Sequence, residues 1–242
     1  MTLFNEGVAH QLSSLFYIIN ATMKKIELLI FGVLLIGLAS ADSEELELHA
    51  MSFNIRLGVA EDGPNHWNLR KELVFDVLRD HQPDVVGVQE AWKIQIDALK
   101  AAFPKFGMIG RSRQADPEKG EWCPIFYRKE KFEVVSEGTF WLSDTPEKEG
   151  TMSWGNNIPR ICTWGRFKDK KTGRTFFLYN THFDHQSQAS REKSAVLCLE
   201  RITARKPSNE AAIFMGDLNA CLLYTSDAAD EGLGVDLGGR RI

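Results

Sequence analysis

Apolar runs that stop abruptly at polar side chains are the main pattern of this sequence. Residues 211–215 are apolar, and Gly216, Asp217 and Asn219 follow them. An apolar run of this length predicts a buried strand. Side chains two apart share one face of an extended strand, so we expect Asp217 and Asn219 to point the same way at its end. The same pattern recurs upstream, at residues 50–54, 85–90 and 176–185.

Three other stretches repeat apolar residues at helical spacing. They lie at residues 69–80, 92–103 and 195–202, and Pro104 ends the second. Apolar residues three and four apart form one face of a helix. We therefore expect three amphipathic helices that cover a sheet.

Further strands are predicted between these helices. Residues 160–168 and 175–181 flank Gly173 and predict a hairpin. Residues 111–121 are polar and predict an exposed loop. Because strands outnumber helices and the helices fall singly between groups of strands, the order predicts two packed sheets covered by helices. The remaining expected strands are residues 46–55, 84–88, 106–109, 122–127, 132–135 and 139–142.

Composition narrows the class of protein without fixing its substrate. The chain has 242 residues, 43% of them hydrophobic and 26% charged, enough to bury the core of one domain. A net charge of -4 argues against a generally basic surface that coats nucleic acid. It is compatible with a local basic groove and with a phosphate substrate.

The four cysteines show no pattern typical of a zinc site. No C-x-x-C pair occurs, so buried thiols are the expected state. A disulfide between Cys123 and Cys162 is the alternative in an exported protein.

Residues 23–41 have the three parts of a secretory signal peptide. Two lysines follow Met23, the apolar run 28–38 comes next, and small residues end at Ala41. The alternative is a membrane anchor, but the run is about ten residues short of the roughly twenty needed to span a bilayer. We expect cleavage after Ala41 and export to the periplasm or the medium. Residues 1–22 are expected to be an extension translated from an upstream start codon.

The polar residues at the strand ends indicate a candidate site. They combine carboxylates, amides and one imidazole, a set that suits Mg²⁺ holding a phosphate. Each has a simpler alternative: Asn54 as a turn residue, Glu90 as a solvated carboxylate and His182 as a surface imidazole. The set is Asn54, Glu90, His182 with Asp184, and Asp217 with Asn219.

Four short motifs follow one another along the chain: Met51-Ser52-Phe53-Asn54-Ile55-Arg56, Val88-Gln89-Glu90, Asn180-Thr181-His182-Phe183-Asp184-His185 and Gly216-Asp217-Leu218-Asn219. In this order they resemble the endonuclease/exonuclease/phosphatase family, which has the DNase I-like fold. The resemblance runs from about residue 46 to residue 220. Asn65, Trp67 and Arg70 also resemble a pattern of exported bacterial members.

The resemblance implies a four-layered α/β/β/α sandwich that hydrolyses a phosphodiester or phosphomonoester. Water would attack phosphorus in line, assisted by Mg²⁺ or alternatively Mn²⁺. The implied substrates are nucleic acid, inositol phosphate, phospholipid or a small molecule. We expect a monomer with no obligate protein partner.

The resemblance also implies a role for each candidate residue. Glu90 is similar to the family's metal-binding glutamate, and Asn54 to the amide that helps to fix metal and phosphate. Asp217 would orient the attacking water, and Asn219 would hold a phosphate oxygen. His182 would stabilise the charge that develops on the phosphoryl group.

Three further residues near these motifs are candidates. Arg160 opens a predicted strand, and its fixed cationic fork suits phosphate oxygens. Asp184 shares the strand face of His182 and is expected to orient it. His185 is left open between a site residue and a surface imidazole.

Two other kinds of protein compete with the hydrolase. One is a noncatalytic or inactive sandwich fragment that retains only metal or phosphate binding. The other is a metal-independent esterase of the α/β-hydrolase type, which is disfavoured because no G-x-S-x-G motif occurs.

Residues 221–242 do not continue the pattern. They resemble translated sequencing-adaptor read-through, so the family domain is expected at residues 42–220. The family has a Ser-Asp-His ending beyond the Asp-x-Asn strand, whereas no histidine follows His185 here. We therefore expect the chain as written to lack a general acid/base partner, to be inactive, and to leave the sandwich incomplete at its C-terminus.

Export should depend on residues 23–41 and not on residues 1–22. Deletion of residues 2–22 is expected to leave export intact and a mature N-terminus at Asp42, because the signal-peptide pattern lies wholly within 23–41. Cell fractionation and N-terminal sequencing measure both. Loss of export after this deletion would show that the extension is required.

Overall fold

The computed structural model describes residues 45–116 and 118–220. The predictions for residues 1–22, 23–41 and 221–242 lie outside the described residues and stay predictions. Within the described ranges, every helix is too short or too polar to span a lipid bilayer.

The first sheet pairs two parallel strands with two antiparallel ones. Strands β1 and β2 run parallel, with Asn54 opposite Gln89. Strand β4 is antiparallel to its neighbours β2 and β3, so β4 begins at the edge where β1 and β2 end. The order across the sheet is β1 (Ala50–Asn54), β2 (Val85–Gln89), β4 (Ile125–Arg128) and β3 (Phe106–Ile109).

The second sheet has the same size and a similar arrangement. Strands β5, β6 and β7 are antiparallel in turn, and β8 runs parallel to β7 with His182 opposite Asp217. The order is β5 (Phe132–Trp141), β6 (Ile161–Asp169), β7 (Thr175–His182) and β8 (Ala211–Asp217).

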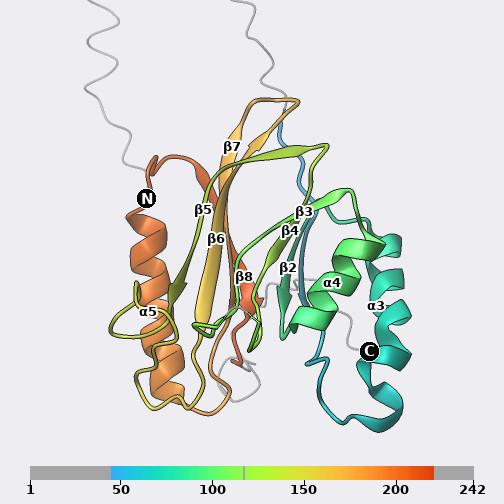
Figure 1. The fold of residues 1–242 in the computed structure, drawn as a ribbon. Helices are drawn as coiled ribbons and strands as arrows, with labels where there is room; N and C mark the ends of the chain where they lie inside the picture. The colour runs from blue at the N-terminus through green and yellow to red at the C-terminus, as the bar shows by residue number, and fades with distance from the viewer. Residues whose placement is uncertain (1–44, 117, 221–242) are drawn as a thin grey trace, which may run out of the picture. The chain divides into compact units, whose positions relative to one another are not determined.

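Helices cover the outer face of each sheet, as Figure 1 shows. The short turn η1 (Gly63–Asn65) leads into α3 (Trp67–His81), which lies with α4 (Lys93–Ala102) against the first sheet. Helix α5 (Gln188–Thr203) lies against the second sheet, where Cys198 packs on Phe177 and Tyr179. The predicted four-layered α/β/β/α sandwich is confirmed.

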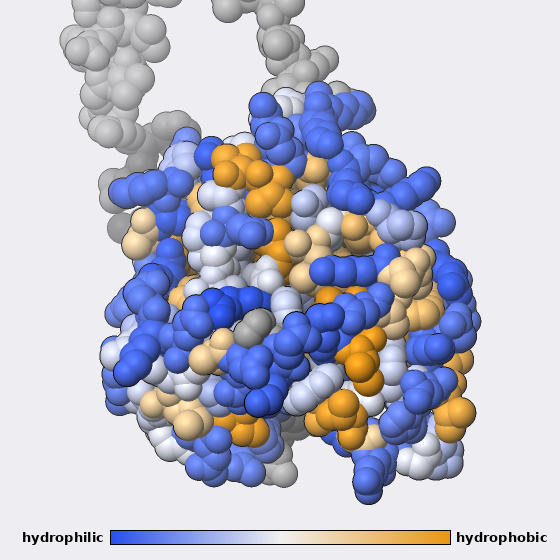
Figure 2. Space-filling model, in the orientation of Figure 1, coloured by the Kyte–Doolittle hydropathy of each residue, from blue (hydrophilic) through white to orange (hydrophobic). Residues whose placement is uncertain are grey.

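Apolar side chains fill the space between the two sheets. Phe167, Phe176 and Leu178 of the second sheet pack there against Val85 and Ile125 of the first, and none of the five is more than 1% exposed. On the face that Figure 2 shows, hydrophilic residues dominate and hydrophobic residues form smaller areas. The sandwich is therefore held mainly by burial of apolar surface between its layers.

One buried amide crosses this apolar interface. Asn180 of β7 is 0% exposed and donates from Nδ2 to the carbonyls of Val88 and Pro124, both at 2.9 Å. Its Oδ1 accepts a 2.6 Å hydrogen bond from Nε2 of Gln89. The side chain therefore ties β7 to the end of β2 and to the residue just before β4.

Three details differ from the sequence-based expectations. The two strands predicted at 132–135 and 139–142 are one strand, β5, which continues through a bulge between Val134 and Ser136. Strand β8 is partly exposed and not buried, because it lies at the edge of its sheet among the described strands. The loop predicted as exposed at 111–121 has buried ends, since Ser112 and Arg113 are 0% and 9% exposed.

The cysteines of the described residues are buried free thiols, as expected. Cys123, Cys162 and Cys198 are unpaired, so the alternative disulfide between Cys123 and Cys162 is not formed. Burial raises the pKa of the Cys123 thiol to about 12, which keeps it protonated and unreactive.

Substitution of Asn180 should destabilise the sandwich. Asn180→Ala is expected to lower the free energy of unfolding by roughly 3 kcal/mol, because it removes three buried hydrogen bonds and leaves a cavity in an apolar interface. Urea denaturation measures this change. Asn68→Ala on the exposed surface of α3 is the control and should stay within about 0.5 kcal/mol of the unsubstituted protein. Equal stability of both variants would contradict the bridging role.

Candidate active site

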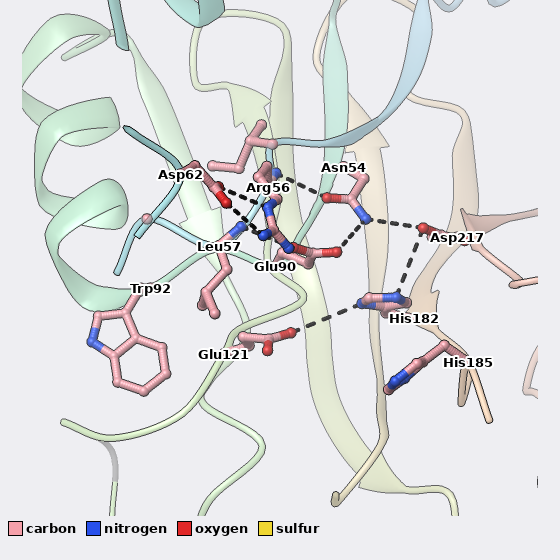
Figure 3. Close-up of polar contacts among 12 residues, drawn as sticks. Asn54, Arg56, Leu57, Asp62, Glu90, Trp92, Glu121, His182, His185 and Asp217 are labelled. Carbon is pink, nitrogen blue, oxygen red and sulfur yellow. Dashed lines mark hydrogen bonds and ion pairs between the residues drawn. The ribbon is translucent and has the colours of Figure 1, made fainter. Parts of the chain in front are cut away.

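Two carboxylates meet at one amide where the parallel strands of both sheets end. Asn54 is the last residue of β1. Its Nδ2 donates to Oε1 of Glu90 and to Oδ2 of Asp217, each at 2.9 Å. Figure 3 shows Asn54 between the two carboxylates, with His182 beside Asp217. The structure thus brings together four of the predicted residues, two from each sheet.

A left-handed turn orients Glu90 into this site. Glu90 has φ 60°, and its Oε2 accepts a 2.8 Å hydrogen bond from the backbone N–H of Leu57. The neighbouring Arg56 is also left-handed, at φ 57°, with Nη1 at 3.9 Å from Glu90 Oε2. The carbonyl of Arg56 accepts from Arg70 Nη2 at 2.7 Å and from Gln95 Nε2 at 2.9 Å. These contacts fix the backbone that holds the Glu90 carboxylate.

The end of β8 turns instead of continuing as an extended strand. Asp217 Oδ1 accepts from the backbone N–H of Asn219 at 3.0 Å, and Asn219 has φ 48°. The Asn219 side chain donates from Nδ2 to the carbonyl of Phe183 at 2.9 Å. The expectation that Asp217 and Asn219 share one strand face is therefore wrong, although both line the site. Gly216 permits the close approach of β8 to β7, since a Cβ there would lie 2.1 Å from the Thr181 carbonyl oxygen.

Asp217 is held as a carboxylate. Burial alone would raise the pKa of its carboxyl, but hydrogen bonds from the Asn54 side chain and the Asn219 backbone lower the pKa below its ordinary value. It is therefore ionised at neutral pH and can accept a hydrogen bond from water.

His182 is held as a neutral imidazole. Burial, followed by the positive charge of Arg160, lowers the pKa of His182 to about 4. Its Nε2 lies 3.7 Å from Asp217 Oδ2, and its Nδ1 lies 3.9 Å from Glu121 Oε2. Nδ1 is buried and has no hydrogen-bond partner among the described residues. At neutral pH His182 can thus donate one hydrogen bond and accept one.

Arg160 and Asp184 form a buried ion pair beside His182. Arg160 Nε lies 3.3 Å from Asp184 Oδ2, and each side chain is only 3% exposed. Asp184 Oδ1 also accepts from the backbone N–H groups of Gln186 and Ser187, at 2.9 and 2.8 Å. The described contacts of Asp184 therefore position Arg160 and the turn into α5. They do not orient His182, contrary to the expectation from the sequence.

Glu121 is a site residue that sequence reasoning missed. It forms a two-pronged ion pair with Arg113, at 3.0 and 2.8 Å, and is the carboxylate nearest to Nδ1 of His182. The sequence-based candidates lie at or near the ends of predicted strands, whereas Glu121 precedes β4. Because β4 runs antiparallel to β2, its beginning lies at the site's edge of the sheet. The carboxylate directly before the apolar run 122–127 was the signal that could have identified it.

Asp217 and Asn219 line two cavities. One, of about 720 Å³, is also lined by Ser52, Asn54 and Gln89. The other, of about 290 Å³, is lined by charged and polar residues that include Glu90, Glu121, Arg56, Arg113, Arg160, His182 and His185. Arg160 therefore lies in the same pocket as His182.

The donor set fits Mg²⁺ only as a partial coordination shell. The described residues hold no cluster of three or more His, Cys, Asp or Glu side chains arranged for a metal. Mg²⁺ usually keeps several waters and binds one or two carboxylates together with substrate phosphates. Glu90 provides one such carboxylate, and Asp217 provides a second oxygen acceptor beside it. The amide nitrogen of Asn54 faces both carboxylates, so in this structure Asn54 turns its nitrogen, and not its oxygen, toward them.

Comparisons with known proteins decide the family. A sequence profile of the Endonuclease/Exonuclease/phosphatase family matches residues 51–237. The chain belongs to this family. A family member from Bacteroides vulgatus is 39% identical, with a TM-score of 0.70, over 73% of this chain and 67% of that chain.

Two further proteins are similar to the present chain. The mannosyl-6-phosphatase of Bacteroides thetaiotaomicron is 35% identical, with a TM-score of 0.70, over 74% of this chain and 68% of that chain. An uncharacterised protein of Acanthamoeba polyphaga mimivirus is 27% identical over 160 residues, which are 63% of this chain. The match spans 59% of the length of that curated relative.

Proposed function

We propose that this family member is a metal-dependent hydrolase of phosphate esters. The observation that carries the proposal is the Asn54 amide, which joins the Glu90 and Asp217 carboxylates beside a neutral His182. Phosphatase activity in a relative that is 35% identical supports it. We propose Mg²⁺ as the ion, with Mn²⁺ as the alternative.

The proposed roles follow from the charge and hydrogen bonds of each side chain. Glu90 would hold the ion, which would neutralise charge on the phosphoryl oxygens. Asp217, an ionised carboxylate, accepts a hydrogen bond from the attacking water and orients it. His182, a neutral imidazole, donates a hydrogen bond to a phosphoryl oxygen as charge develops on it. Asn54 keeps the two carboxylates at a fixed separation.

Arg160 and Asn219 complete the proposed phosphate site. Arg160 is buried and permanently charged, and it lines the 290 Å³ pocket beside His182. Asn219 lines the same pocket, and its amide nitrogen is already bonded to Phe183. Its remaining N–H, and not its carbonyl oxygen, would therefore face a phosphate oxygen. We propose a small phosphomonoester as substrate, because the pocket is small and the mannosyl-6-phosphatase acts on one.

Mg²⁺ binding should depend on the charge of Glu90. Glu90→Gln is expected to weaken Mg²⁺ binding by about tenfold or more, because a neutral amide is a poorer ligand for a hard cation. Isothermal titration calorimetry measures the affinity, and EDTA should abolish hydrolysis of p-nitrophenyl phosphate by a version that carries the Ser-Asp-His ending expected from the family. The control is Glu72→Gln on exposed α3. Unchanged Mg²⁺ affinity in Glu90→Gln would refute the assignment.

Turnover should depend on His182 more than substrate affinity does. His182→Ala is expected to lower kcat for p-nitrophenyl phosphate by about 100-fold with little change in KM, because its hydrogen bond strengthens as charge develops. Steady-state kinetics with saturating Mg²⁺, on a version that carries the Ser-Asp-His ending expected from the family, measure both constants, and His81→Ala at the end of α3 is the control. A change confined to KM would show a simple substrate contact. No turnover by this version without the substitution, with Mg²⁺ binding retained, would favour the noncatalytic alternative.

A further inference from the structure

His185 lies in the proposed substrate pocket. It is not one of the three hydrogen-bonded residues Asn54, Glu90 and Asp217. It follows β7 by three residues, is exposed, and lines the 290 Å³ pocket together with His182, Arg160 and Asp217. Figure 3 shows it near His182, on the side away from Asn54. Its exposed imidazole is therefore available to a molecule that occupies this pocket.

A hydrogen bond from Arg160 fixes which nitrogen of His185 carries the proton. Nη2 of Arg160 lies 2.9 Å from Nδ1 of His185. A guanidinium group has only donors, so Nδ1 must be the acceptor and the ring proton must lie on Nε2. His185 thus offers an N–H donor on the ring edge away from Arg160.

The position of that donor is set by buried contacts. Arg160 cannot follow a mobile imidazole freely, because its Nε is held by Asp184 in an ion pair of two side chains each 3% exposed. Asp184 in turn accepts from the backbone of Gln186 and Ser187, and its carbonyl accepts from Arg191 Nη1 at 2.9 Å. The segment that carries His185 is therefore fixed on both sides of the residue.

The walls of the pocket indicate what the donor would meet. Its apolar lining is limited to Leu57 and Ile158, and none of the described lining residues is Phe, Tyr or Trp. A lipid chain would require an apolar wall, and a nucleobase usually stacks on an aromatic ring. Hydroxyl groups of a polar molecule instead match a wall of charged side chains and an N–H donor.

We infer that His185 is a specificity-determining residue that donates its Nε2–H to a hydroxyl oxygen on the alcohol part of a phosphomonoester. This inference rests on the proposed function and names its substrate class as phosphates of hydroxylated molecules, such as sugars. Arg160 then acts on both parts of the substrate. It contacts the phosphate directly, and it sets the tautomer of His185, which binds the alcohol part.

A binding experiment on the full chain tests this role without turnover. The probes are the non-hydrolysable 6-phosphonate of mannose and methylphosphonate, titrated calorimetrically in the presence of Mg²⁺. The unsubstituted chain is expected to bind the sugar phosphonate at least tenfold more tightly than methylphosphonate. In His185→Ala this ratio should fall by about tenfold, which corresponds to the loss of one hydrogen bond of about 1.4 kcal/mol.

Two conservative variants separate recognition from a structural role. His185→Gln places an amide N–H near the position of Nε2 and is expected to restore most of the preference. His185→Asn keeps an acceptor for Arg160 but is too short to reach the ligand, so it should resemble His185→Ala. Rescue by Asn and not by Gln would overturn the inference and show that His185 only positions Arg160.

The remaining outcomes distinguish this inference from the proposed function. Equal binding of both probes by the unsubstituted chain would overturn the role of His185 while leaving the phosphate site intact. Binding of neither probe would refute the phosphate site itself, and the inference with it. Long-range ¹H–¹⁵N spectra of the histidines give a second readout: a proton on Nδ1 of His185 would contradict the assigned tautomer.

Discussion

The buried amide of Asn180 is the contact on which the relative position of the two sheets depends. Apolar packing holds the sheets together, but it is nondirectional and allows them to slide. The Asn180 side chain donates to the carbonyls of Val88 and Pro124 and accepts from Gln89. These three hydrogen bonds oppose sliding, because a shift would leave the buried Asn180 amide unpaired. His182 lies two residues after Asn180 in the chain. The amide therefore also determines how far the imidazole lies from the carboxylates of the other sheet.

The features that the sequence predicted share a physical basis. Each depends on a local pattern, either an apolar run that forms a strand or the polar residue at its end. Parallel pairing of β1 with β2 and of β7 with β8 then brings four such ends together, as the resemblance implied. Asn54, Glu90, His182 and Asp217 were identifiable for this reason. The layers followed as well, because the alternation of helices and strand groups leaves few ways to bury every apolar face.

The features that the sequence did not predict depend on contacts between distant segments. The position of Glu121 follows from the antiparallel direction of β4, which no local pattern reveals. Asn219 left the expected strand face because its backbone bonds to Asp217 and its side chain to Phe183. Asp184 was expected to orient His182. It instead forms a buried ion pair with Arg160. For Asn219 and Asp184, contacts with distant segments overrode the two-residue period of the strand.

The distribution of charge in the site is the last consequence of this framework. Glu90 and Asp217 make one side of the site anionic. On the other side, Arg160 and His185 offer hydrogen-bond donors, because Arg160 fixes the tautomer of His185. His182 lies between them, and burial together with Arg160 keeps it neutral. A protonated His182 would pair with Asp217 and compete with the attacking water for that carboxylate. In the proposed reaction, a neutral His182 leaves Asp217 to the water and its own N–H to a phosphate oxygen, so the charge of Arg160 supports both roles.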